Sequence, residues 1–329
     1  MAANTTTTVA PTERPVQLDE LLIGLTYIVP TVFEVVFYIP CMIVMRNDPE
    51  LKDHSCFKLM FHLGLADFVN MISQLLAGIL TITRYSYVWP YWLNQVVGTI
   101  LVGFGWFTYI TLIHVIAFNR WVIMCLSEYW QEKLFSPLAT NLWLAGSWLY
   151  GGVWLVLCAT PWGSFIYLES LYTWYYDHNM LWYEPLKAVT WWQNMIVLNG
   201  SIVWYILIVL YMRFHLSTLM VDVTEERARE RKILKQAAII CLYTLLWDQY
   251  WHLAPYLTSF QYAYAVGNMF WVSNSAINPL VYLTLNKQIS TKVKQMYGCE
   301  KRDEVQASQT NRTNHGKKKA WTGNQTAKA

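Results

Sequence analysis

The sequence predicts an all-α membrane protein, a seven-transmembrane helix bundle with a short amphipathic helix after the seventh span. Its 329 residues are 55% hydrophobic and only 14% charged, with a mean hydropathy of +0.25. This composition is too apolar for a soluble globule. The 18 Trp and 22 Tyr support the same class, because such rings favour membrane interfaces and aromatic ligand sites.

The first segment, residues 1–20, is polar and rich in threonine. It lacks the basic, apolar and small-residue regions of a cleavable signal peptide, so we expect the first span to act as the insertion signal. Asn4 begins an Asn-Thr-Thr sequon and is a candidate glycosylation site.

The bundle, residues 21–285, is predicted from seven apolar stretches, each long enough to cross a hydrocarbon core that needs roughly 20 residues. They cover about 21–45, 57–82, 94–125, 138–161, 188–212, 237–258 and 263–285.

Two segments follow the seventh span. Residues 286–298 place apolar side chains at three- to four-residue spacing beside lysines, which predicts a short helix lying on a membrane surface. We expect the polar residues 299–329 to form a disordered cytoplasmic tail. Cys299 is a candidate palmitoylation site, although a free cytosolic thiol is the simpler interpretation.

The distribution of basic residues predicts the orientation. With the N-terminus outside, only Arg14, Arg84 and Lys187 of the 24 lysines and arginines lie outside. Cytoplasmic loops carry the excess of Lys and Arg in membrane proteins. We therefore expect the N-terminus outside and the C-terminus inside.

One layer near the middle of the membrane should collect polar side chains. At about 1.5 Å per residue, Glu34, Asp67, Asn274 and Ser275 all lie about 15 Å from the inner ends of their spans, with Asn278 one turn below. Two carboxylates at that depth indicate that one is protonated or that a cation such as sodium lies between them. Alternatively, the cluster is a set of interhelical hydrogen bonds that only holds the packing.

The seventh span carries this layer on a distorted helix. Pro279 removes one backbone hydrogen bond and frees a neighbouring carbonyl, which Asn274 or Asn278 could occupy. Tyr282 follows one turn later. The stretch therefore predicts a bend with a polar lining.

A second polar group lies in the outer half of the sixth span. Asp248 and His252 are four residues apart and share one helix face. Aromatic residues gather nearby in the sixth span, the long outer loop and the start of the fifth span. An aromatic site with few polar groups is typical of a small-molecule pocket, and an ordinary aromatic belt is the alternative. The candidate ligand residues are Asp248, His252, Trp251, Trp174, Tyr176, Trp191 and Trp192.

Arg120 follows Asn119 at the inner end of the third span. An arginine at that depth needs a carboxylate or carbonyl partner unless it reaches the interface. It could hold the inner surface closed or meet an incoming protein.

These features resemble a rhodopsin-like G-protein-coupled receptor. The motifs are Leu65-Ala66-Asp67, Arg120, and Asn-Ser-x-x-Asn-Pro-x-x-Tyr at 274–282. Stretches 33–45, 55–61, 119–120, 160–161 and 282–287 are most similar to nematode serpentine chemoreceptors of the Srt type. The resemblance covers about residues 20–297. It implies that Asp67, Asn274, Ser275 and Asn278 surround a sodium ion or waters, and that Arg120 and Tyr282 rearrange when a G protein binds.

The sequence also departs from the wider family. Asn119 replaces the usual acidic neighbour of Arg120, which removes the local ion pair, and Tyr109 replaces a serine of the sodium site. The family's usual disulfide cannot form, because neither the start of the third span nor the second outer loop contains a cysteine. Leu253 stands where a tryptophan precedes the span-six proline. These departures do not favour sodium near Asp67 or the family's usual toggle, and we expect no other metal and no cofactor.

We therefore expect a chemosensory receptor that binds an extracellular ligand, with a small molecule favoured over a peptide, and activates a heterotrimeric G protein. Its expected location is the lipid bilayer of the plasma membrane, with the sensory cilium as a candidate site, and no nucleic acid is expected as a partner. A proton-coupled transporter is less favoured, because no internal repeat is visible. An enzyme is not expected, because no serine or cysteine accompanies Asp248 and His252 and no metal motif is present.

Overall fold

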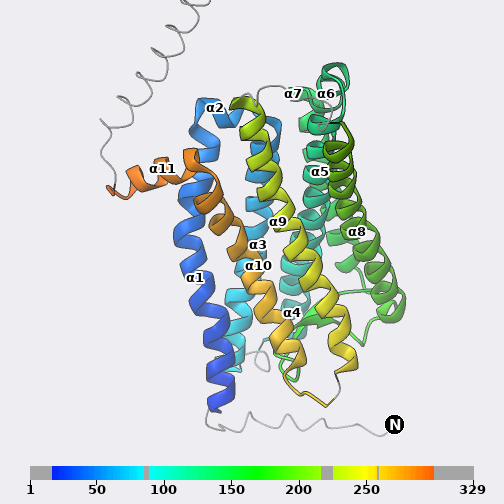
Figure 1. Cartoon of the computed structure of the whole chain (residues 1–329). Coiled ribbons are helices and arrows are strands. Elements are labelled where there is room, and N and C mark those ends of the chain that lie inside the picture. The colour runs from blue at the N-terminus through cyan, green and yellow to red at the C-terminus, as the bar shows by residue number, and fades with distance from the viewer. Residues whose placement is uncertain (1–16, 85–88, 216–224, 258, 300–329) are drawn as a thin grey trace, which may run out of the picture.

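The computed structural model describes residues 17–84, 89–215, 225–257 and 259–299. Long helices lie side by side and form a bundle (Figure 1). The expected disordered tail after Cys299 and the Asn4 sequon lie outside the described residues. The long helices are α1 (Leu18–Asn47), α3 (Ser55–Thr83), α5 (Gly105–Cys125), α7 (Pro137–Cys158), α8 (Tyr183–His215), α9 (Glu225–Leu253) and α10 (Ala263–Leu285).

Within the described residues, five helical segments are long and apolar enough to cross a membrane: Leu18–Asn47, Ser55–Thr83, Tyr91–Cys125, Pro137–Cys158 and Tyr183–Phe214. The helices α9 and α10 complete the bundle of seven. Their lower apolarity has a clear origin, because α9 begins in charged residues and α10 buries Asn268, Asn274 and Asn278. These amides face the interior of the bundle, where polar groups of membrane helices find partners.

The helix α9 starts 12 residues before the expected span at 237. It ends at Leu253, and Pro255 lies in the following 3₁₀ turn η3 (Ala254–Tyr256). The proline therefore terminates the helix instead of bending it. Leu253 is 51% exposed, so the position two residues before Pro255 lies outside the bundle interior.

The third span is one continuous helical stretch that contains a π-helical turn. It consists of α4 (Tyr91–Gly98), η2 (Thr99–Phe104) and α5. Such turns are rare and often mark functional sites. Thr99 Oγ1 donates a hydrogen bond to the Cys158 carbonyl oxygen over 3.0 Å, which fastens the turn to α7.

Helices α1 and α3 approach each other closely at a pair of glycines. A Cβ atom on Gly24 would meet the carbonyl oxygen of Gly78 at 2.8 Å, and one on Gly78 would meet the Gly24 oxygen at 2.9 Å. Small residues permit such backbone approach in membrane bundles. This packing holds the polar side chains of α1 against those of α3.

A two-stranded antiparallel hairpin covers one end of the bundle. Strands β1 (Phe165–Leu168) and β2 (Thr173–Tyr176) pair with Phe165 opposite Tyr176 and Leu168 opposite Thr173. The hairpin lies beside α4, at the lower end of the bundle in Figure 1. We call this the hairpin end, and we call the opposite end, which contains Arg120 and α11, the arginine end.

Short helices complete the arginine end: α2 (Pro49–Lys52), α6 (Glu128–Phe135) and α11 (Lys287–Met296). Helix α11 leaves the bundle sideways (Figure 1) and buries Ile289 and Val293. Its Lys292 pairs with Asp48. Burial raises the pKa of Asp48, but hydrogen bonds and the Lys292 charge outweigh burial and lower it below its usual value.

Candidate functional site

A buried polar layer surrounds Asp67 in the middle of the bundle. Tyr38 donates its hydroxyl to Asp67 Oδ2 over 2.8 Å, and Ser275 donates to Oδ1 over 3.3 Å. Asn278 Nδ2 also donates to Oδ2. The carboxylate thus joins α1, α3 and α10 and is satisfied by donors of the chain itself, as buried charges require.

Glu34 lies buried in the same region of α1, but neither of its oxygens has a hydrogen-bond partner among the described residues. Tyr38, one turn further along α1, bonds to Asp67, whereas from depth alone we expected Glu34 in this layer. Tyr38 was missed because a tyrosine in an apolar helix carries no distinct sequence signal.

Tyr109 connects the layer to α9. Its hydroxyl accepts a hydrogen bond from Asn274 Nδ2 over 3.0 Å, and Thr244 Oγ1 donates to Asn274 Oδ1 over 2.8 Å. The large side chain that departs from the sodium-site pattern is therefore part of a hydrogen-bonded chain through α5, α10 and α9. Tyr282 is fully buried beside Tyr38, with ring centroids 6.2 Å apart. Pro279 is buried within α10.

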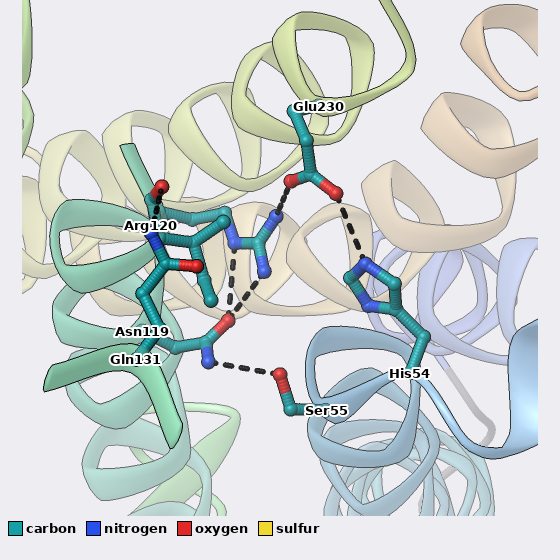
Figure 2. Close-up of polar contacts among 7 residues, drawn as sticks. His54, Ser55, Asn119, Arg120, Gln131 and Glu230 are labelled. Atoms are coloured by element: carbon teal, nitrogen blue, oxygen red, sulfur yellow. Dashed lines mark hydrogen bonds and ion pairs between the residues drawn. The ribbon is translucent and has the colours of Figure 1, made fainter. Parts of the chain in front are cut away.

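Arg120 is fully buried at the arginine end and has two partners (Figure 2). Its Nη1 donates to Glu230 Oε2 over 2.7 Å, and its Nε donates to Asn119 Oδ1 over 3.1 Å. Asn119 donates in turn to Ser55 Oγ over 3.1 Å, and His54 Nε2 lies 3.0 Å from Glu230 Oε1. We call Arg120, Glu230, Asn119, His54 and Ser55 the arginine latch.

The latch supplies an acidic partner that the sequence did not indicate. The local ion pair is absent because Asn119 is neutral, and Glu230 on α9 supplies the carboxylate from 110 residues further along the chain. No sequence spacing indicated this pairing. Asn119 instead orients the guanidinium and ties it to the start of α3. Gln131 Nε2 donates to the carbonyl oxygens of Ile123 and Leu126, which caps the end of α5 below the latch.

The surroundings of Glu230 stabilise its ionised form. Burial alone would raise its pKa, but the hydrogen bond from His54 and the positive charge of Arg120 outweigh burial and lower the pKa to about 2. Glu230 lies before the expected sixth span. Because the folded pKa is depressed, the stabilisation is present above the ordinary carboxyl pKa and is lost only as the pH falls toward 2. The ion pair is therefore intact at neutral pH.

A cavity of about 40 Å³ lies between the hairpin and the polar layer. We call it the tryptophan cavity. Asp248 and Asn194 supply polar groups, and the aromatic lining includes Phe107, Phe165 and Tyr176 together with Trp106, Trp174, Trp247, Trp251 and Trp271.

The tryptophans of this cavity pack on one another. The Trp106 and Trp247 ring centroids are 4.6 Å apart at 75°, and those of Trp247 and Trp271 are 5.5 Å apart. Trp247 Nε1 donates to the Gly267 carbonyl oxygen over 2.8 Å, and Trp174 Nε1 donates to the Ser73 oxygen over 2.9 Å. Trp247, not the Leu253 position, thus supplies a tryptophan deep in the sixth span.

The predicted ligand residues divide into two groups. Asp248, Trp251, Trp174 and Tyr176 line the tryptophan cavity, and His252 lies beside it with Nε2 3.3 Å from Asp248 Oδ2. Trp191 and Trp192 do not belong to the lining and are 37% and 60% exposed. They contact each other with ring centroids 4.5 Å apart. Trp106, Trp271 and Asn194 were missed, because a tryptophan on an apolar helix face looks like ordinary core.

Hydrogen bonds hold the hairpin against α4, where the wider family has a disulfide that this chain lacks. Asn94 Oδ1 accepts from the Tyr167 backbone N–H over 2.8 Å, and Asn94 Nδ2 donates to the Tyr167 oxygen over 3.2 Å. Asp177 accepts from Ser164 and Gln95, each over 3.1 Å, and from Tyr91. We call Asn94, Gln95, Tyr91 and Asp177 the hairpin tether.

Cys299 lies exposed three residues beyond α11. Its placement next to a helix that lies sideways at the arginine end is compatible with a lipid anchor or with a free thiol.

The chain matches the family described as Serpentine type 7TM GPCR chemoreceptor Srt over residues 9–306. The fold is similar to the crystal structure of squid rhodopsin, with a TM-score of 0.71 and 16% sequence identity over 92% of this chain and 94% of that chain. No curated protein matches the sequence at a significant level.

Proposed function

Because the chain belongs to the Srt family of serpentine 7TM GPCR chemoreceptors, we propose that a ligand binds in its tryptophan cavity and that this binding releases the arginine latch. The chain is a G-protein-coupled chemosensory receptor and a multi-pass membrane protein. In the proposed orientation the hairpin end faces the outside of the cell and the arginine end faces the cytoplasm. The basic residues support this orientation, since most of the lysines and arginines that the structure describes lie toward the arginine end.

One observation carries the proposed coupling: two helices contain residues of both sites. Helix α5 carries Trp106 near one end and Arg120 near the other, while α9 carries Asp248 and Glu230. At 1.5 Å per residue, the two sites are about 20–27 Å apart along these helices. A movement of α9 relative to α5 at the cavity would therefore separate Glu230 from Arg120.

The polar layer lies between the two sites and links the same helices. Tyr109 of α5 and Thr244 of α9 both bond to Asn274, while Asp67 holds Ser275 and Asn278. A ligand can shift this arrangement only if it binds one state better than the other. We propose that the described structure is the latched state, and that the latch must open before a heterotrimeric G protein can contact Arg120.

The size of the cavity favours a small molecule over a peptide. A volume of about 40 Å³ is far below the roughly 300–1,000 Å³ of drug-sized pockets, and the hairpin covers it. A peptide would have to displace the hairpin, which the tether opposes. We place the receptor at the plasma membrane, where such a ligand is accessible.

The test is a ligand screen in reporter cells that express the full chain at the surface. Small organic molecules and a peptide library are applied separately to these cells and to cells without the receptor. We expect receptor-dependent signals from small molecules. Responses confined to peptides would contradict the ligand class, and transport current without G-protein signalling would contradict the receptor mechanism.

A further inference from the structure

We propose that the tryptophan cavity recognises a small organic cation, an alkylammonium group, with Asp248 as its counter-ion. The inference deepens the proposed function by naming the ligand class of the same cavity. It depends on three features: one buried carboxylate, a surrounding set of tryptophan rings, and the absence of a cation of the chain among the described lining residues.

Asp248 is the single charged residue among the described residues that line the cavity. Its Oδ1 accepts a hydrogen bond from Asn194 Nδ2 over 2.9 Å. Its Oδ2 is buried and has no hydrogen bond within the described part of the chain, although His252 Nε2 lies 3.3 Å away. A buried carboxylate is costly unless a cation or a donor reaches it, and among the described residues the second oxygen of Asp248 has only the His252 ring nearby, without a hydrogen bond.

Besides the carboxylate, a cation site needs aromatic ring faces, and the tryptophans of the cavity provide them. A cation within about 6 Å of an indole face is attracted by the ring quadrupole, and tryptophan is the strongest of the aromatic residues in this role. Trp106, Trp247, Trp251 and Trp271 contact one another around the cavity, with centroid separations between 4.6 and 6.5 Å. Rings in such a group present both faces and edges to an occupant.

Among the described residues, no lysine or arginine fills this role. The observed cation contacts with aromatic rings involve Arg46, Lys133 and Lys187, on Phe61, Tyr129, Trp130 and Tyr183. None of these rings lines the cavity. A ligand with an ammonium group would therefore complete both Asp248 and the tryptophan rings.

The cavity volume limits the size of this group. Each water needs about 10–15 Å³ by this measure, so about 40 Å³ accommodates only a few non-hydrogen atoms without side-chain movement. A methylated ammonium head fits this limit better than a bulky ring system.

The experiment uses the purified full chain in lipid-containing detergent and measures its thermal stability with increasing probe at constant ionic strength. The cationic probes are tetramethylammonium and choline. The neutral control is 3,3-dimethylbutan-1-ol, which has the shape of choline with carbon in place of nitrogen. We expect the cations to stabilise the protein and the neutral control to bind at least about tenfold more weakly.

Asp248→Asn should weaken choline binding at least about tenfold, because Asn retains an oxygen for Asn194 but loses the charge. Glu184→Gln is the matched control, since Glu184 is an exposed carboxylate near the same end, and it should leave binding unchanged. If Asp248→Asn does not fold, the comparison of choline with its neutral isostere on the unaltered chain decides the question.

The outcomes separate this inference from the proposed function. No stabilisation by either cation, or equal affinity for choline and its neutral isostere, would overturn the ligand class. Reporter responses to uncharged molecules that survive Asp248→Asn would also overturn it while leaving the receptor mechanism intact. Choline binding that requires Asp248 but never produces a G-protein signal would support the inference and contradict the proposed coupling.

Discussion

The two ends of the bundle use different interactions. The tryptophan cavity depends on contacts between apolar rings around one carboxylate. The arginine latch depends on charged hydrogen bonds, with Arg120 donating to Glu230 and Asn119. Ring contacts are individually weak and tolerate small shifts, whereas a buried ion pair loses much of its energy when one partner moves away. The cavity is thus suited to gradual adjustment and the latch to an abrupt opening.

The largest effect should come from Arg120→Ala. Removing the guanidinium leaves no group to meet the G protein and leaves Glu230 with His54 as its partner. We expect evoked signalling to fall to the level of cells without receptor, while surface labelling persists. Arg213→Ala is the control, because Arg213 is an exposed arginine of α8. Unchanged signalling in Arg120→Ala would remove Arg120 from the coupling mechanism.

Gly98→Ala tests the hairpin end alone. A Cβ atom on Gly98 would overlap the Phe165 carbonyl, so the hairpin must shift away from α4. We expect ligand potency in the reporter assay to fall about tenfold, which corresponds to about 1.4 kcal/mol, with unchanged basal signalling. Gly152→Ala meets nothing within 4 Å and should have no effect. A raised basal signal in Gly98→Ala would show that the hairpin itself holds the latched state.

Asp67→Asn and Glu34→Gln form a matched pair within the polar layer. Asp67 accepts three hydrogen bonds, and each bond to a charged group contributes about 1.5–3 kcal/mol. We expect Asp67→Asn to change basal signalling about threefold or more and Glu34→Gln to change it by less than about twofold. The measurement is basal reporter activity at equal surface expression. Equal effects of the two substitutions would mean that Asp67 has no special part in switching.

Much of the bundle could be predicted from the sequence, because long apolar stretches indicate the membrane spans and basic loops indicate the cytoplasmic side. From the depth of each residue we also expected Asp67 in one layer with Asn274 and Ser275, with Asn278 one turn below, and hydrogen bonds join Asp67 to Ser275 and Asn278. Both predictions depend on the length of a helix and on the cost of burying polar groups, which are local properties of the sequence.

The remaining contacts depend on which helix faces meet, and one sequence does not contain that information. Glu230 and Arg120 are 110 positions apart, and the mixed charge around Glu230 suited a plain solvent-exposed helix equally well. Trp106 and Trp271 resemble ordinary core residues until the cavity is seen. In the sequence, the position two residues before Pro255 was compared with the family's tryptophan, and it holds Leu253. In the structure Pro255 follows the end of α9, and the buried tryptophan of this helix is Trp247.

In the proposed mechanism, the pairing of Glu230 with Arg120 holds the receptor in its resting state. The decisive measurement is the basal signalling of Glu230→Gln, without ligand and at equal surface expression. Glu132→Gln, an exposed carboxylate of α6 at the same end, is the control. We expect Glu230→Gln to raise basal signalling about fivefold or more and Glu132→Gln to leave it unchanged. If the Glu230→Gln receptor shows unaltered basal signalling and a normal evoked response, the ion pair does not hold the resting state.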